Sequence, residues 1–285
     1  MEGLAAAISA HWALVSGVVF LVFAAVETAR PDRRSRAYTT GRWLGHIAVY
    51  AGNLVFSSML LPWIFLALLA DRDAMHGVRL FGRIEAVGGP WAVLAIGLLG
   101  IDLLIYWAHR AQHAAPMLWR FHAVHHADTE MDISTALLHH PIAYLGMALT
   151  VGLVMYAAGM PAWVFPVYGL FEATVGPFQH VATPVPDRLE RAVRWLLVTP
   201  GMHQVHHSTD PAHYDRNFAN VLSVWDRLFG TLRVAPAAER DAIRFGVEPY
   251  TGTQHRGLGW MLMMPFRMGP FRMGPLKTWP FRVTQ

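Results

Sequence analysis

The chain has 285 residues, of which 54% are hydrophobic and only 15% charged. A soluble domain usually carries about 25% charged residues, so we expect much of the surface to face lipid. The net charge of +4 is nearly all arginine, which we attribute to membrane topology and anionic headgroups rather than to nucleic-acid binding. The absence of cysteine excludes disulfides, thiolate metal sites and a cysteine nucleophile.

Apolar stretches recur along the first two thirds of the chain and predict about four membrane spans. Residues 8–29, 43–70 and 91–108 are each long enough to cross, or nearly cross, a hydrocarbon core of about 30 Å. Residues 142–175 are also apolar but are interrupted at Gly159-Met160-Pro161. This interruption predicts a two-helix or re-entrant hairpin. The polar residues 71–89 are predicted to form a loop or an interfacial segment.

Arginines between the first two spans predict the orientation in the membrane. The segment 30–42 contains five of them, and such loops usually stay in the cytoplasm. The remaining spans and the hairpin then bring the His-rich segments 109–140 and 176–213 to the cytoplasmic face, which would be that of the inner membrane in a bacterium. After residue 180 the chain is more charged. We therefore predict an all-α integral membrane helical bundle with a helical cytosolic cap.

Histidines are concentrated in three motifs, H-R-A-Q-H at 109–113, H-A-V-H-H at 122–126 and H-Q-V-H-H at 203–207. Residues three or four apart share a helix face, so the histidines at the first and fourth positions of H-x-x-H-H should point the same way. The fifth is turned by about 100° and could reach a neighbouring ion. Eight imidazoles are too many for one metal, because a zinc site takes four ligands. The eight predicted ligands of a two-metal site are His109, His113, His122, His125, His126, His203, His206 and His207.

Two further histidines lie beside the hairpin and are predicted to join the ligands. His180 follows the hairpin in the motif Phe178-Gln179-His180, and His140 directly precedes Pro141. For His140 the alternative is a structural role at a helix end. Its neighbour His139 is left out of the site.

Asp102 and Tyr106 are the candidate catalytic residues. Both lie in the third span, and their spacing places them on one helix face with His109 and His113. An ionisable group inside a membrane span suggests a function, and Asp102 could orient a ligand histidine. The alternative for Asp102 is a hydrogen bond between helices.

At these motifs, roughly residues 95–235, the chain resembles the fatty acid hydroxylase/sterol desaturase superfamily of membrane di-iron proteins. Further matching features are His140-Pro141, Gln179-His180, Asn217-Phe218 and the segment Trp225–Thr231. We assign a structural role to the segment Trp225–Thr231. The resemblance divides the chain into an N-terminal transmembrane region (1–90), a catalytic domain (91–235) and an interfacial or partly disordered tail (236–285). Some members carry one more histidine, where this chain has Gly176. The ligand set is thus nine, or is completed by His140 or by water.

The resemblance implies two iron ions, molecular oxygen as co-substrate and a lipid substrate taken from the bilayer. Imidazole also binds copper, nickel and zinc, so zinc could substitute for iron. Hydroxylation is favoured over desaturation, although the family does both. The chain has no G-x-G-x-x-G loop, so we expect a separate electron donor of the ferredoxin, cytochrome or reductase type.

Two other classes of function remain open from the residues. A His-rich membrane protein could transport metal, but transport would place ligands within the spans. A membrane zinc hydrolase is the other alternative, but the sequence has no H-E-x-x-H motif.

Overall fold

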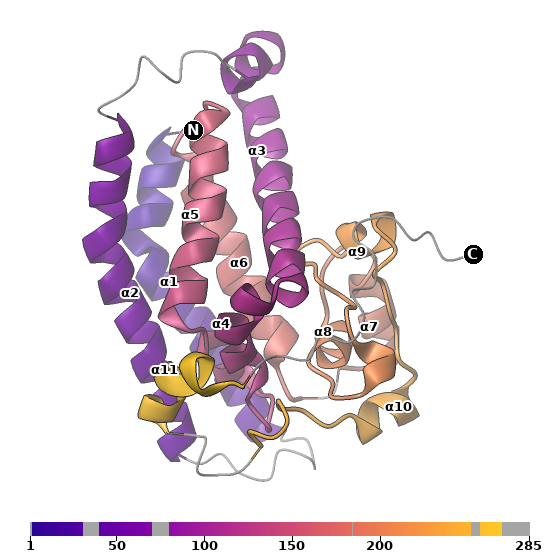
Figure 1. The fold of residues 1–285 in the computed structure, drawn as a ribbon. Coiled ribbons are helices and arrows are strands. Elements are labelled where there is room, and N and C mark those ends of the chain that lie inside the picture. The colour runs from indigo at the N-terminus through magenta and orange to yellow at the C-terminus, as the bar shows by residue number, and fades with distance from the viewer. Residues whose placement is uncertain (1, 31–39, 70–79, 184, 252–256, 270–285) are drawn as a thin grey trace.

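A computed structural model describes residues 2–30, 40–69, 80–183, 185–251 and 257–269. Three long helices, α1 (Glu2–Ala29), α2 (Thr40–Leu69) and α3 (Leu80–Ala114), run along the long axis of the molecule (Figure 1). Each is long and apolar enough to cross a membrane, and their outward surfaces carry exposed leucine, valine and tryptophan side chains. The chain is thus a membrane protein. Most of the arginine-rich segment 30–42, and residues 270–285, lie outside the described residues.

Helix α3 begins earlier than the predicted third span and bends near its start. It starts at Leu80, within the segment predicted to be a loop, and Gly89 interrupts it with a φ of 66°. Glycine tolerates this left-handed conformation because it has no Cβ. The following Pro90 has no N–H to donate to the helix. The first turns therefore leave the axis of the long part that runs down to the histidines.

The predicted hairpin is confirmed as a pair of helices, α5 (Pro141–Ala157) and α6 (Val164–His180). The turn between them lies at the expected interruption, where Gly159 has a φ of 74°. Helix α6 approaches α3 closely at Gly97, where a Cβ would lie only 2.8 Å from a methyl carbon of Val164. Helix α1 packs along α6, and α2 packs along α5. The hairpin thereby forms the centre of the bundle.

A cap, defined as residues 185–251, lies beside the lower half of α3 (Figure 1). Short helices build it: α7 (Asp187–Val193), α8 (Pro200–His206), α9 (Val224–Leu228) and α10 (Ala237–Ala242). Helix α4 (Pro116–His126) connects the end of α3 to the hairpin, and α11 (Leu258–Arg267) packs across α4 and α2. The predicted tail 236–285 therefore contains two helices among its described residues.

Buried charges at the ends of α1 and α2 fix the loops that follow α4 and α6. The Glu27 carboxylate accepts hydrogen bonds from the backbone N–H of Ala182 (2.5 Å) and of Ile133 (3.2 Å). The Arg42 guanidinium forms buried ion pairs with Asp128 (2.5 Å) and Asp132. Both loops adjoin histidine motifs, so these contacts connect the bundle to the site.

Candidate metal centre

Four helix ends meet where the bundle adjoins the cap, and each brings histidines. The last turns of α3 carry one motif, α4 carries the second, and α8 with the residue after it carries the third. The end of α6 adds His180. Nine of the ten predicted metal ligands come together in this way, namely His109, His113, His122, His125, His126, His180, His203, His206 and His207.

The nine histidines fall into two groups, and in each group the potential ligand atoms all lie within 4.8 Å of one another. Each H-x-x-H-H motif contributes to both groups. The histidines at its first and fifth positions belong to one group, and the histidine at its fourth position belongs to the other. The expected pairing of the first with the fourth was wrong, because residues four apart are turned by only about 40° on a helix and residues three apart by about 60°. The first group is His109, His113, His122, His126 and His206, and the second is His125, His180, His203 and His207.

The two groups adjoin one another. The rings of His126 and His207, one from each group, are stacked with their centroids 4.2 Å apart. His125 of the second group also lies 5.5 Å from His126, centroid to centroid. Two ions held by these groups would therefore be neighbours.

Backbone carbonyls on the outside of the centre determine which nitrogen of four rings carries the proton. A carbonyl can only accept a hydrogen bond, so the Nδ1 that faces it must be the N–H donor. A neutral imidazole has one N–H, and the Nε2 of each such ring is then a bare lone pair directed inward. The four contacts run from Nδ1 of His109 to Phe218 (2.9 Å), of His125 to Leu138 (3.1 Å), of His180 to Gly176 (2.7 Å) and of His206 to Arg216 (2.8 Å).

One pair of rings provides a direct test of whether a metal ion fits. The Nε2 atoms of His125 and His180 lie 3.3 Å apart, and both are lone pairs for the reason just given. They cannot hydrogen bond to each other, and two facing lone pairs repel. The Nε2 atoms of His113 and His206 are also buried without a hydrogen-bond partner, at a typical cost of about 1–3 kcal/mol each. A cation within each group would satisfy all of these atoms, so the residues fit bound metal ions.

The electrostatics of the centre favour neutral rings. Burial is the main cause, and neighbouring imidazoles add to it, in lowering the pKa of six histidines well below the ordinary value. A metal ligand must be a deprotonated, neutral imidazole. The six lie outside the long helices and are His122, His125, His126, His203, His206 and His207.

A short segment of the cap, residues 216–218, supplies two of the four outer carbonyls. Asn217 holds this segment in place, because its side chain donates to the carbonyl oxygens of Met202 and Arg233 at 2.8 Å each. The Asp226 carboxylate accepts from the backbone N–H of Phe218 at 2.8 Å. Burial raises the pKa of Asp226 to about 6. Residues 216–218, held in part by Asp226 of the segment Trp225–Thr231, thus orient the rings of His109 and His206. The spacing of these motifs did not indicate this role.

The comparison with known families agrees with this geometry. The family model described as fatty acid hydroxylase matches residues 94–231, which include all nine grouped histidines. Residues 94–231 belong to the fatty acid hydroxylase family. No solved structure matches the chain.

Curated relatives of this chain act on lipids according to their names. The chain is 33% identical to alkylglycerol monooxygenase of Danio rerio over 165 residues, which cover 55% of this chain and 33% of the relative. It is 30% identical to the ornithine lipid hydroxylase OlsE of Rhizobium tropici over 61% of this chain and 50% of the relative. A putative sterol desaturase of Arabidopsis thaliana is 23% identical over 53% and 51%. The chain thus spans a third to a half of the length of these relatives.

Asp102 joins the bundle to the cap. One of its carboxylate oxygens accepts from the hydroxyl of Tyr168 (2.7 Å) and the backbone N–H of Val221 (3.1 Å). The other accepts from the backbone N–H of Leu222 (2.9 Å) and the indole N–H of Trp225 (2.8 Å). Both oxygens are therefore occupied by groups that are not histidines.

Tyr106, the other candidate catalytic residue, also faces the cap. Its hydroxyl hydrogen bonds with that of Thr231 at 2.9 Å, and its ring stacks on Phe229 with centroids 5.2 Å apart. The side chain is fully buried. These contacts favour a structural role for Tyr106.

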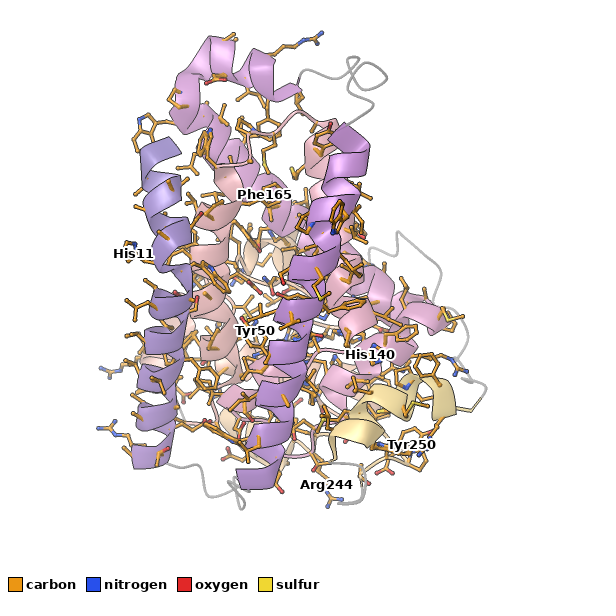
Figure 2. The ribbon with its side chains drawn as sticks, turned by 90° about the vertical axis from the view of Figure 1, so that its left-hand side faces the viewer. His11, Tyr50, His140, Phe165, Arg244 and Tyr250 are labelled. Atoms are coloured by element: carbon orange, nitrogen blue, oxygen red, sulfur yellow. The ribbon has the colours of Figure 1, made fainter. Side chains whose placement is uncertain are left out.

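The structure places His140 outside both histidine groups. Its Nδ1 accepts from the backbone N–H of Ile142 and so caps α5, while its Nε2 donates to the carbonyl of Leu262 on α11. Figure 2 shows His140 close to α11, and it shows His11 pointing away from the bundle. With both ring nitrogens engaged, His140 has no lone pair left for a metal.

His139, which the sequence analysis left out, lies closer to the centre than its neighbour. Its ring stacks on His125 with centroids 4.3 Å apart, and burial lowers its pKa to about 4. It belongs to neither group. Its position beside a ligand could not be read from the adjacent pair of histidines in the sequence.

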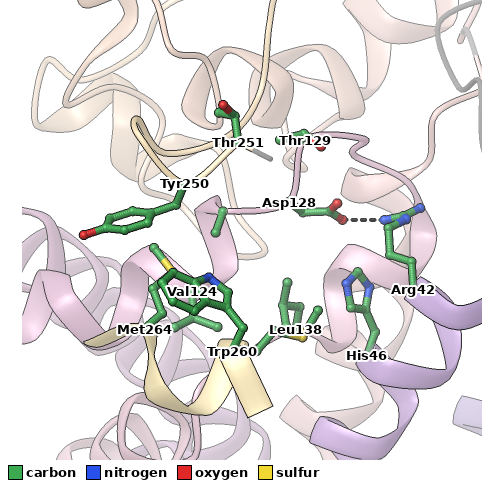
Figure 3. A pocket seen from close by; sticks show the side chains of 12 residues that line it. Arg42, His46, Val124, Asp128, Thr129, Leu138, Tyr250, Thr251, Trp260 and Met264 are labelled. Carbon is green, nitrogen blue, oxygen red and sulfur yellow. Dashed lines mark hydrogen bonds and ion pairs between the residues drawn. The ribbon is translucent and has the colours of Figure 1, made fainter. Parts of the chain in front are cut away.

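A small pocket lies against the loop after α4 (Figure 3). Arg42 and Asp128 form its polar wall, and Trp260 and Met264 of α11 form part of its apolar wall. Its volume of about 20 Å³ is enough for a single water molecule. It is too small for a lipid chain.

Proposed function

We propose that this chain is a non-haem di-iron monooxygenase that uses O2 to hydroxylate a C–H bond of a membrane lipid. The observation that carries the proposal is the pair of adjoining histidine groups, in which four rings direct a bare Nε2 lone pair inward. Membership of the fatty acid hydroxylase family supports iron as the metal, although imidazole would also accept zinc. The nine grouped histidines are the proposed ligands, with His140 outside the set.

A pair of bound ferrous ions would supply the electrons and the oxygen activation that an unactivated C–H bond requires. The protein contributes position and environment. Outer carbonyls orient the rings so that their lone pairs point inward, as the hydrogen-bond partners of metal-ligating histidines usually do. Burial keeps the rings neutral and limits the access of water. Asn217 acts as a positioning residue in this proposal, and Asp102 and Tyr106 have structural roles.

A lipid would reach the centre from the bilayer, because the helices that can cross a membrane lead down to the histidines. The relatives named monooxygenase and hydroxylase favour retention of oxygen over desaturation. The substrate class proposed is therefore a lipid with a saturated carbon at the site of oxidation. Reductant would come from a separate electron-donor protein, and the centre would lie on the cytoplasmic side.

The geometry argues against metal transport and against a zinc hydrolase. The histidines are gathered in one buried cluster at helix ends, whereas a transport path would distribute polar ligands along the spans. A catalytic zinc uses three protein ligands, and each group here offers more.

The test is to profile lipids from cells that express the full chain under ¹⁸O₂, with His203→Ala as the inactive reference. Hydroxylation predicts a lipid that gains one ¹⁸O atom, made only by the unsubstituted chain. A product with a new double bond and no label would establish desaturation instead. An unchanged lipid profile in cells that contain the iron-loaded protein would contradict the proposal.

Electron supply is tested with the purified protein. The chain with NAD(P)H and O2 alone should give no product, and addition of a ferredoxin with its reductase should start turnover. Product formation without any added protein would refute the separate donor.

A further inference from the structure

The cap is fastened to α3 at a level well away from the metal ligands. Asp102 precedes His109 by seven residues, which is about 10 Å along a helix axis. The segment from Val221 to Trp225 is hydrogen bonded to Asp102 and therefore lies beside a part of α3 that belongs to a candidate membrane span. One turn further from the centre, Leu99 of α3 is 45% exposed. This edge of the cap thus lies level with lipid-facing surface.

That edge carries an apolar patch, defined as Trp195, Leu196, Val224 and Leu228. Their exposed fractions are 73%, 62%, 40% and 65%. An antiparallel bridge between Leu197 and Leu222 places the two segments side by side. Val224 and Leu228 are the ends of α9 and share a face of that helix. A cluster of large apolar side chains at the surface of a cap usually marks a contact site.

Arginines surround the patch. The guanidinium of Arg227 lies over the ring of Trp195, 4.9 Å from its centroid, and donates to the backbone carbonyl of Arg194. Arg188 and Arg191 are exposed on the neighbouring α7. The rim of the patch is therefore cationic.

The acidic residues nearest to this rim are engaged elsewhere and do not offset its charge. Glu190 is buried and accepts from the hydroxyl of Thr199. Asp187 pairs with Arg240, and Asp226 is buried against its own loop. Surfaces that bind at the interface of an anionic bilayer typically combine tryptophan and leucine with neighbouring arginines.

We propose that this patch seats the cap in the bilayer, with its apolar side chains among the upper acyl chains and its arginines at anionic phospholipid headgroups. In Figure 1, α9 is at the end of the cap nearest the middle of α3, and α10 is at the opposite end. The continuity with the exposed face of α3 favours a lipid surface over a protein partner. The inference depends on the position of the cap and not on the proposed reaction.

The absence of cysteine from the chain allows a direct test with one environment-sensitive fluorophore on a single introduced cysteine. The labelled positions are Leu228→Cys and Leu196→Cys in the patch, with Ala238→Cys as the matched control, because Ala238 is exposed on α10. The full chain is reconstituted in vesicles of phosphatidylcholine with phosphatidylglycerol. Nitroxide-labelled lipids then serve as quenchers.

Both patch probes should emit further to the blue than the control and should be quenched by the nitroxide lipids, while the control is not. Omitting phosphatidylglycerol should weaken the quenching. Two patch probes that emit as in water and escape quenching would overturn the proposal. Patch probes that become shielded only when an electron-donor protein is added would also overturn it, in favour of a protein docking site.

Discussion

Two buried polar regions lie close together in this protein, and they differ in how their atoms are satisfied. In the acidic anchors at Asp102 and Asp226, the carboxylate oxygens accept hydrogen bonds from the chain itself. In the histidine centre, the outer nitrogens of four rings are satisfied by carbonyls, while inner nitrogens face one another or have no partner. A complete set of partners indicates a structural role, and converging unpaired lone pairs indicate a site for a cation.

The largest effect is expected in the centre itself. His125→Ala should remove at least one iron and abolish product formation, because His125 belongs to the smaller group and also lies beside His126 of the other. Iron per chain and lipid product are the measurements. His11→Ala is the matched control, since His11 is exposed on α1. A fully active His125→Ala protein would remove the basis of the proposed site.

The next largest effect is expected at Asp102, which joins the bundle to the cap. Asp102→Asn replaces one acceptor oxygen by an N–H donor that would face the donors from the cap. We expect a loss of roughly 1–3 kcal/mol in the free energy of unfolding, with iron still bound in the protein that folds. Thermal unfolding followed by tryptophan fluorescence measures it, and Glu85→Gln, an exposed position on the same helix, is the control. Unchanged stability with lost turnover would make Asp102 a catalytic residue.

A smaller effect is expected at Tyr106. Tyr106→Phe removes one buried hydrogen bond, to Thr231, and should lower the free energy of unfolding by about 1 kcal/mol. The kcat should stay close to that of the unsubstituted chain. A strong fall in kcat at full iron content would contradict the structural role and support the role predicted from the helix face.

The smallest effect is expected at His140. His140→Asn keeps a side-chain acceptor for the backbone N–H of Ile142, and asparagine is among the preferred residues at this helix position. Iron content and activity should therefore be nearly unchanged. If the variant instead lost one of its irons, His140 would have to be added to the ligand set.

Local spacing made part of this architecture predictable. The histidine motifs and the interruption at Gly159 involve residues that are neighbours in the sequence. Helix geometry therefore predicts shared helix faces from the motifs and a turn from the interruption. The assignment of histidines to groups failed at the same level of detail, because residues three and four positions along a helix both lie within about 60° of the first residue, on opposite sides of it.

The partners of the remaining residues are too distant in sequence for spacing to reveal them. Asp102 accepts hydrogen bonds from the backbone N–H groups of Val221 and Leu222, which are 119 and 120 residues away in the sequence. Arg120 of α4 holds carbonyls at the end of α11, at Pro265 and Met268, and the carbonyls of Arg216 and Phe218 are backbone atoms without a sequence signal. Such contacts depend on how the cap folds back on the bundle.

The most direct measurement of the central claim is the metal content of the purified full chain, together with its Mössbauer spectrum after loading with iron. The two adjoining groups predict two irons per chain whose spins are coupled, with both lost in a variant that combines His125→Ala and His113→Ala. One iron per chain, or a single zinc that iron does not replace, would contradict the account.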